Sequence, residues 1–358
     1  MTRRAILVAG LSLILVGILV GAGMPMVKPP QQLGDPLPGL TPGELARFTQ
    51  GKAVFSREFT ASTGLGPFFN NVSCAQCHED PVTGGAGAFN EDDVDVERHA
   101  SAGDQPTCDE LVPFGGPVFR EQTTGPTLPP IPADAMVHVG LRSTPMLFGF
   151  GLVEAIPDRA IVANEGRAGG RVARLANGQI GRFGRKATDP DLPTFVTGAF
   201  KNEQGIDVPS ELSVADRDLT VDFIRLLAPP APLHISGVER EGRELFHRAG
   251  CAECHIPTFV TKSSIKVLDQ QVVHLYSDLL LHDMGPALAD LCKGVADRAE
   301  FRTEPLMGLR ARERFLHDGR ALTLESAIIQ HGGQGAPAAF LNLSRRERDA
   351  LLRFLKSL

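Results

Sequence analysis

The sequence reads CAQCH at residues 74–78 and CAECH at residues 251–255. Each copy places two thiols one helical turn apart and an imidazole directly after the second thiol. This spacing is the attachment signature of c-type haem. Structural zinc sites pair one Cys-x-x-Cys with another and need no adjacent histidine, so zinc is the weaker interpretation. The two copies therefore predict two covalently bound haem c groups.

The motif also assigns a role to each of its residues. The thiols add to the haem vinyl groups, and the histidine becomes the proximal ligand of the iron. The predicted attachment residues are Cys74 and Cys77 with the ligand His78 for haem 1, and Cys251 and Cys254 with the ligand His255 for haem 2.

The composition is that of a globular chain that is long enough for two ordinary domains. It has 358 residues, of which 42% are hydrophobic, and its formal net charge is −6. No basic patch is evident in the sequence, so nucleic acid is not an expected partner.

The N-terminal residues 1–27 have the pattern of a targeting segment. Arg3 and Arg4 precede an apolar run over residues 5–27 that contains no charged residue. Such a run is either a cleaved signal peptide or an uncleaved membrane anchor. We therefore expect a periplasmic protein, soluble after cleavage or tethered to the inner membrane. Residues 28–40 are predicted to be a Pro-rich linker.

Two cysteines remain outside the haem motifs, at Cys108 and Cys292. In an oxidising compartment these two side chains could form a disulfide. They could equally be two buried free thiols, and the sequence leaves both alternatives open.

Four landmarks recur in the same order in the two halves of the chain. A helix precedes each haem motif, an Arg-x-x-Pro segment follows it, and a closing helix with a serine N-cap ends each half. The repeated pieces are Gly51-x-x-x-Phe55 with Gly242-x-x-x-Phe246, Arg142-x-x-Pro145 with Arg302-x-x-Pro305, and Ser213 with Ser344. Convergent amphipathic helices would explain each similarity alone, but the shared order favours duplication.

This order predicts a mainly α fold with two cytochrome-c-like haem domains related by internal duplication. The first domain is expected over residues 41–228 and carries a large insertion, and the second over residues 234–358. The prolines at 229, 230 and 232 mark the boundary.

The sixth iron ligand separates an electron-transfer haem from one that binds a substrate. His331 ends a predicted helix before Gly332 and Gly333 and is the candidate for haem 2, with Met284 and Met307 as rivals. For haem 1 no residue has a convincing local signature, which is consistent with an open site. The nearby candidates there are His99, His138, Met136 and Met146.

The order of several segments resembles the bacterial di-haem cytochrome c peroxidase superfamily, and most closely its di-haem oxidoreductase branch. The segments that carry the resemblance are LFGFGLVEAIP at 147–157, DLLLHDMG at 278–285, FLHDGRA at 315–321 and TLESAIIQH at 323–331. The resemblance implies a peroxidase-type enzyme, and it adds the expectation of a calcium ion, although no acidic loop of the sequence demands one.

Two features depart from the peroxidase pattern. His331 stands where the peroxidases have the distal methionine of the electron-entry haem, so the resemblance implies two histidine ligands for haem 2. Such a change is expected to lower its reduction potential. The chain also has no tryptophan, which the peroxidases place between the haems, and its one tyrosine is Tyr276.

A peroxidase cycle needs a carboxyl group in a dry pocket to move a proton between the two peroxide oxygens. Glu154 is the first candidate, because an acid within the apolar run 152–156 is costly unless it is used. Glu203 is the second, because it lies near the position of the distal glutamate in the resembling family. For either residue, a salt bridge or a backbone cap is an equally good explanation.

The sequence thus predicts an exported di-haem oxidoreductase in which haem 1 reacts with hydrogen peroxide or another small substrate. Haem 2 would pass on electrons from a soluble or membrane-bound electron-transfer partner. Two alternatives stay open. One is an oxidoreductase of a small sulfur compound or thiol, and the other is a cytochrome that only transfers electrons.

Overall fold

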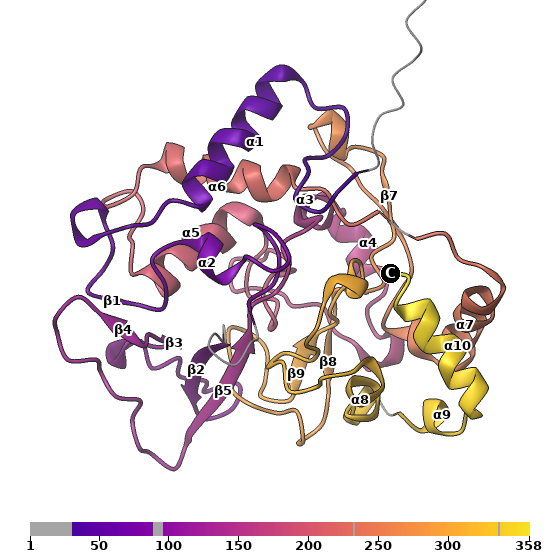
Figure 1. Cartoon of the computed structure of the whole chain (residues 1–358). Helices are drawn as coiled ribbons and strands as arrows, with labels where there is room; N and C mark the ends of the chain where they lie inside the picture. The colour runs from indigo at the N-terminus through magenta and orange to yellow at the C-terminus, as the bar shows by residue number, and fades with distance from the viewer. Residues whose placement is uncertain (1–30, 89–95, 232, 336) are drawn as a thin grey trace, which may run out of the picture. The chain divides into compact units, whose positions relative to one another are not determined.

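Helices joined by long loops and short antiparallel strands make up the computed structural model (Figure 1), which describes residues 31–88, 96–231, 233–335 and 337–358. The predicted signal or anchor at 1–27 lies outside the described residues. Among the residues described, no helix is both long and apolar enough to cross a membrane. Residues Gln32–Leu358 form one compact unit, and its division into domains near residue 230 stays a prediction.

The helices fall mainly at the start and end of each predicted half. They are α1 (Pro42–Phe55), α2 (Cys74–Cys77), α3 (Phe150–Glu154), α4 (Asp158–Val162), α5 (Leu192–Gln204), α6 (Val214–Leu226), α7 (Gly237–Arg248), α8 (Leu324–Ile329), α9 (Ala338–Leu341) and α10 (Arg345–Leu355).

The strands form small antiparallel sheets. The three-stranded sheet has the order β3-β2-β5, and the pairs are β1-β4, β6-β7 and β8-β9. The strands are β1 (Phe68–Phe69), β2 (Val96–Ala102), β3 (Val118–Phe119), β4 (Gln122–Thr123), β5 (Val137–Ser143), β6 (Phe259–Val260), β7 (Val272–Val273), β8 (Leu281–Asp283) and β9 (Glu300–Arg302).

Local hydrogen bonds start the long helices where the sequence predicts. Thr41 and Glu44 form a capping box at the start of α1, and Ser344 and Glu347 form another at the start of α10. Ser213 caps α6 by accepting a hydrogen bond from the backbone N–H of Asp216. The predicted N-caps are therefore confirmed, because each satisfies a backbone donor that a helix start leaves unpaired.

In each half, the first helix packs against the closing helix through a glycine. A Cβ atom at Gly51 of α1 would lie 2.0 Å from the carbonyl oxygen of Leu219 in α6. A Cβ atom at Gly242 of α7 would lie 2.0 Å from the carbonyl oxygen of Ala350 in α10. The two helix pairs can approach this closely only because the glycines have no side chain. Figure 1 shows both pairs, α1 with α6 and α7 with α10.

The sheet β3-β2-β5 was not predicted from the sequence. Strands β2 and β5 pair over seven residues each, with Glu97 opposite Arg142. A disulfide between Cys108 and Cys292 joins the segment after β2 to the second half of the chain, so the pairing alternative for these two cysteines is confirmed. The strands escaped prediction because their pairing depends on residues about 40 positions apart, which local patterns do not report.

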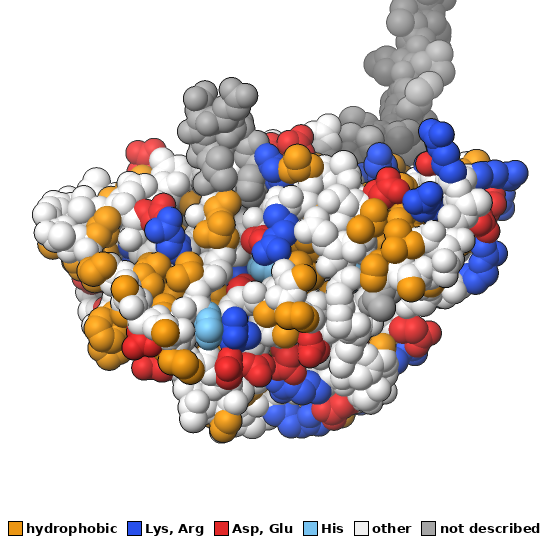
Figure 2. Space-filling view, turned by 90° about the horizontal axis from the view of Figure 1, so that it is seen from below, with side chains coloured by type: hydrophobic (Ala, Val, Ile, Leu, Met, Phe, Trp, Pro, Cys, Tyr) orange, Lys and Arg blue, Asp and Glu red, His pale blue; other side chains and the backbone are white. Residues whose placement is uncertain are grey.

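Charges of both signs are spread over the surface that Figure 2 shows. On this face, acidic and basic side chains lie beside one another and beside hydrophobic ones. The net negative charge is thus not gathered into one acidic patch on this face.

We predict that the Gly242→Ala variant is less stable than the natural protein. Its methyl group would meet the backbone of α10, which cannot give way as a flexible side chain can, so the free energy of unfolding should fall by about 1–3 kcal/mol. Gly237→Ala in the same helix is the control, because no heavy atom lies within 4 Å of its added methyl group. That control should be unchanged or stabilised by up to about 1 kcal/mol in denaturant unfolding. Equal stability of the two variants would contradict the packing argument.

Candidate functional site

Each Cys-x-x-Cys-His motif faces a cavity. The first cavity has a volume of about 520 Å³, and Cys74 and His78 line it. The second has a volume of about 430 Å³, and Cys251, Cys254 and His255 line it. Both volumes lie in the range of cofactor and small-molecule sites, about 300–1,000 Å³.

The backbone of both motifs forms one helical turn, which brings its thiols and imidazole together. The N–H of His78 donates to the carbonyl of Cys74 over 3.0 Å, and the N–H of His255 donates to the carbonyl of Cys251 over the same distance. Before the second motif, Gly250 has φ of 80° and ends α7, as predicted. The sequence spacing therefore becomes the local geometry that the attachment chemistry requires.

The three histidines that are predicted to bind iron share one hydrogen-bonding arrangement. In each ring, Nδ1 faces a backbone carbonyl, which can only accept a hydrogen bond, so Nδ1 carries the proton and Nε2 keeps its lone pair. The partners are Gly85 for His78 at 3.1 Å, Tyr276 for His255 at 2.9 Å, and Ala327 for His331 at 2.8 Å. This is the arrangement that orients metal-bound imidazoles in other proteins.

Burial also keeps these imidazoles neutral. It lowers the pKa of both His78 and His255 to about 4, and it lowers the pKa of His331 below its ordinary value. A histidine must be neutral to bind a metal. Because thiols and available Nε2 atoms line the same cavities, the residues present fit two covalently attached haem groups.

The rival methionines lie in different surroundings. Met284 lines the second cavity together with His331, whereas Met307 is not among its lining residues and packs against Gly149. His331 and Met284 are therefore the two candidate ligands that line the second cavity.

Of the candidates for the sixth ligand of haem 1, His99 alone lines the first cavity within the described residues. Its Nε2 is bonded to the carboxylate of Glu97 at 3.0 Å, and its Nδ1 is buried without a partner. Met136 is more than half exposed, and Met146 is buried elsewhere in the core.

The two predicted acids differ in their surroundings. Glu154 accepts hydrogen bonds from the Arg225 side chain at 2.6 Å and from the backbone N–H of Leu192 at 3.0 Å, and it lines neither cavity. Glu203 lines the first cavity and accepts a hydrogen bond from Asn70 at 2.7 Å. The geometry favours Glu203 as the acid beside haem 1.

The charge balance of the first cavity depends on residues that the sequence did not point to. Glu97 of β2 lines this cavity, and so does Lys293, which follows the disulfide-bonded Cys292. Burial, followed by the charge of Glu97, raises the pKa of Glu203, and burial likewise raises the pKa of Glu97. A signal for Glu97 exists in the sequence, because Glu97 and His99 alternate and so share one face of a strand.

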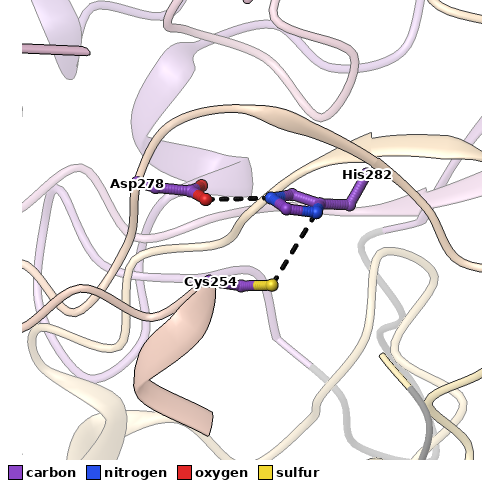
Figure 3. Close-up of side chains that lie close together, drawn as sticks. All are labelled: Cys254, Asp278 and His282. Carbon is purple, nitrogen blue, oxygen red and sulfur yellow. Dashed lines mark hydrogen bonds and ion pairs between the residues drawn. The ribbon is translucent and has the colours of Figure 1, made fainter. Parts of the chain in front are cut away.

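Asp278 and His282 form a hydrogen-bonded pair beside Cys254 of the second motif (Figure 3). His282 Nε2 is 2.9 Å from an Asp278 carboxylate oxygen, and His282 Nδ1 is 3.1 Å from the side-chain oxygen of Gln334. Burial opposes protonation of His282, but the hydrogen bond to Asp278 raises its pKa to about 10. Both ring nitrogens thus face acceptors, as a protonated imidazole requires.

The same cluster has the composition of a metal site, because the Cys254 thiol, Asp278 and His282 have ligand atoms within 4.8 Å of one another. However, Cys254 belongs to the haem motif, and attachment would convert its thiol to a thioether. We therefore interpret Asp278 and His282 as residues that support the wall of the second cavity. Their hydrogen bond accounts for the aspartate and the histidine at positions 1 and 5 of the DLLLHDMG segment.

One known protein family matches part of this chain. Residues 194–358 match the family model described as "Di-haem oxidoreductase, putative peroxidase". These residues are thus similar to the di-haem oxidoreductase family. The resemblance inferred from the sequence is confirmed, the protein is an oxidoreductase, and haem is the cofactor that this family implies. No curated protein matches this chain.

Solved structures provide distant similarities at low identity. Hydrazine synthase of Kuenenia stuttgartiensis is 15% identical, with 98% of this chain and 100% of that chain covered and a TM-score of 0.45. The di-haem peroxidase BthA of Burkholderia thailandensis is 14% identical, with 87% and 86% covered and a TM-score of 0.48. A MauG-like protein associated with microbial copper homeostasis is 15% identical, with 59% and 89% covered and a TM-score of 0.36.

We predict that Glu154→Gln destabilises the protein. The variant would remove the closer of the two carboxylates that pair with the part-buried guanidinium of Arg225 and leave only Asp222 at 3.2 Å, so the free energy of unfolding should fall by about 1–3 kcal/mol. Glu58→Gln, at an exposed position, is the control and should be unchanged. Denaturant unfolding checks both variants, and an unaltered midpoint for Glu154→Gln would show that the ion pair contributes little.

Proposed function

We propose that this protein is an exported di-haem c-type oxidoreductase of the peroxidase type. Haem 1, on Cys74, Cys77 and His78, is the reaction site. Haem 2, on Cys251, Cys254 and His255 with His331 as its second ligand, relays electrons to it. The observation that carries the proposal is the difference between the cavities. The second cavity is lined by His331, whose Nδ1 is bonded to a backbone carbonyl and whose Nε2 is available. In the first cavity, Nε2 of His99 is bonded to the carboxylate of Glu97, and Glu203 lines the cavity as a further carboxyl group.

The reaction that we propose is the reduction of hydrogen peroxide to water. One peroxide takes up two electrons and two protons and gives two water molecules, and the electrons come from an external electron-transfer partner. Bound haem supplies the iron at which the oxygen–oxygen bond is broken. Hydrogen peroxide and an electron donor are thus the partners that the peroxidase family suggests.

The protein's own contribution is proton transfer by Glu203. Asn70 donates a hydrogen bond to Oε2 of Glu203 and fixes the carboxyl group, so that Oε1 is left to exchange the proton. Because the pKa of Glu203 is raised, the group can change protonation within the neutral range, as a general acid or base must. The carboxylate takes a proton from the near peroxide oxygen and returns it to the far one.

The finer architecture belongs to the same proposal. We propose two cytochrome-c-like halves that arose by duplication, with a large insertion in the first half. The glycine-mediated helix pairs, the matching N-caps and the carbonyl-bound proximal histidines support it, since each recurs at the equivalent position.

Export to the periplasm is supported by the Cys108–Cys292 disulfide, since disulfides persist in oxidising compartments. Residues 1–27 would then act as the signal peptide or the membrane anchor. A calcium ion stays an expectation of the resemblance alone.

The proposed reaction predicts a slow Glu203→Gln variant. General acid–base groups contribute about 10²–10⁴-fold, so the rate constant for reaction with peroxide should fall by about that factor. Because the raised pKa keeps Glu203 protonated above the ordinary glutamate range, the rate of the natural protein should rise with pH through the neutral range. The variant should lose this rise. Stopped-flow absorbance measures both rates, with Glu58→Gln as the control.

The same experiment separates the three candidate functions. Rapid reaction with a small thiol and poor reaction with peroxide would favour the sulfur oxidoreductase. Two low-spin haems that are inert to peroxide in every redox state would leave electron transfer alone.

The ligand assignment predicts the spectrum of His331→Ala. Loss of the second imidazole should convert haem 2 from low-spin to high-spin, which optical and electron paramagnetic resonance spectra detect. His247→Ala, at an exposed position of α7, is the control and should leave the spectra unchanged. An unchanged low-spin signal in His331→Ala would transfer the assignment to Met284.

A further inference from the structure

Three arginines surround one part-buried glutamate near the two cavities. Glu304 accepts hydrogen bonds or ion pairs from Arg185 at 2.8 Å, from Arg302 at 2.9 Å and from Arg312 at 2.8 Å. The cluster therefore carries a net charge of +2 from its four members. We call these four residues the arginine cluster.

The arginine cluster is shared by the two cavities. Arg185 and Arg302 line both of them, and Arg312 and Glu304 line the second. A cationic cluster in this position lies against both haem sites, which is where a residue must be to influence both irons.

Several guanidinium N–H groups of this region have no partner. The Nε atoms of Arg185 and Arg312 are buried without a hydrogen bond within the described residues, and so is one terminal nitrogen of Arg142, which lines the first cavity. A buried charged donor without an acceptor is costly, and guanidinium groups are suited to carboxylates because they present paired donors. The unpaired donors thus point to carboxylate ligands.

The charge balance supports the same conclusion. The charge of Arg142 is neutralised by Asp290, whose carboxylate also lies 3.2 Å from Lys186. His317 adds no charge, because burial lowers its pKa to about 3. Glu304 compensates only one of its three arginines. An uncompensated buried charge is strongly unfavourable, so further anions are expected beside the arginine cluster.

Haem groups supply such anions. Attachment through the vinyl groups leaves the propionate carboxylates of each haem free, and the arginines lie on the walls of the cavities that the haems would fill. We propose that the arginine cluster binds propionates of both haems and thereby couples the reduction potentials of the two irons. This inference rests on the proposed function, which supplies the two haems.

The repeated Arg-x-x-Pro segments fit this role. Pro145 lines the first cavity and Pro305 lines the second, so each segment lies along one haem site. Arg142 and Arg302 then occupy equivalent positions at the start of each segment. Of these two, Arg302 lines both cavities, and with Arg185 it makes the link between them.

Redox titration of the intact holoprotein tests the proposal with two variants of opposite charge effect. Arg185→Gln removes a cation that favours the reduced irons, so the reduction equilibrium constant of both haems should fall about tenfold, which is about 59 mV for a one-electron couple. Glu304→Gln removes an anion and should raise both potentials. Arg159→Gln, at an exposed position of α4, is the control and should change neither.

Opposite shifts at both haems would support the proposal, because general loosening of the structure would move both variants in one direction. Shifts in the same direction, at one haem only, or at neither would overturn it. If Arg185→Gln fails to fold, Arg312→Gln replaces it and should lower the potential of haem 2 more than that of haem 1, since Arg312 lines only the second cavity.

The outcome is separable from the fate of the proposed function. Protein that contains two attached haems but shows no shift in either variant would refute the arginine cluster alone. Protein that attaches no haem would refute the proposed function.

Discussion

A hydrogen bond from an imidazole Nδ1 to a backbone carbonyl is the interaction on which both cavities depend. It fixes the ring tautomer and directs Nε2 into the cavity at His78, His255 and His331. The acceptors are main-chain atoms, so their positions depend on the packing of whole segments. The close helix pairs at Gly51 and Gly242 form the rigid frame behind these segments. Iron chemistry at either site would therefore depend on backbone packing that lies well away from the metal.

The two cavities differ in the lining residues that come from segments outside the internal repeat. The sheet β3-β2-β5 brings Glu97 to the first cavity, and the segment after Cys292 brings Lys293 to it from the second half. The second cavity receives His331 from the end of α8. The histidines of the two Cys-x-x-Cys-His motifs thus have similar surroundings, whereas the other lining residues of the two cavities differ. This difference is the physical basis for the unequal roles that we propose for the two haems.

Local features of the fold could be predicted from the sequence, and long-range ones could not. The helices around the motifs, their N-caps and the stop at Gly250 depend on neighbouring residues and were predictable. Glu154 looked like an unpaired acid because its partner Arg225 lies 71 residues away on another helix. Glu97, Lys293 and the arginine cluster were missed for the same reason, since their environments are created only by tertiary contacts.

The Cys108–Cys292 disulfide has a consequence for the making of this protein. Under the proposed haem attachment, four of its six cysteines must remain reduced until they react with haem, while the other two are oxidised to each other. Both reactions would take place on the same chain. A wrong pairing between the two sets of cysteines would then block haem attachment, and it would also prevent the joining of the β2 segment to the second half. The order of oxidation and haem insertion during maturation therefore decides whether the first cavity is ever completed.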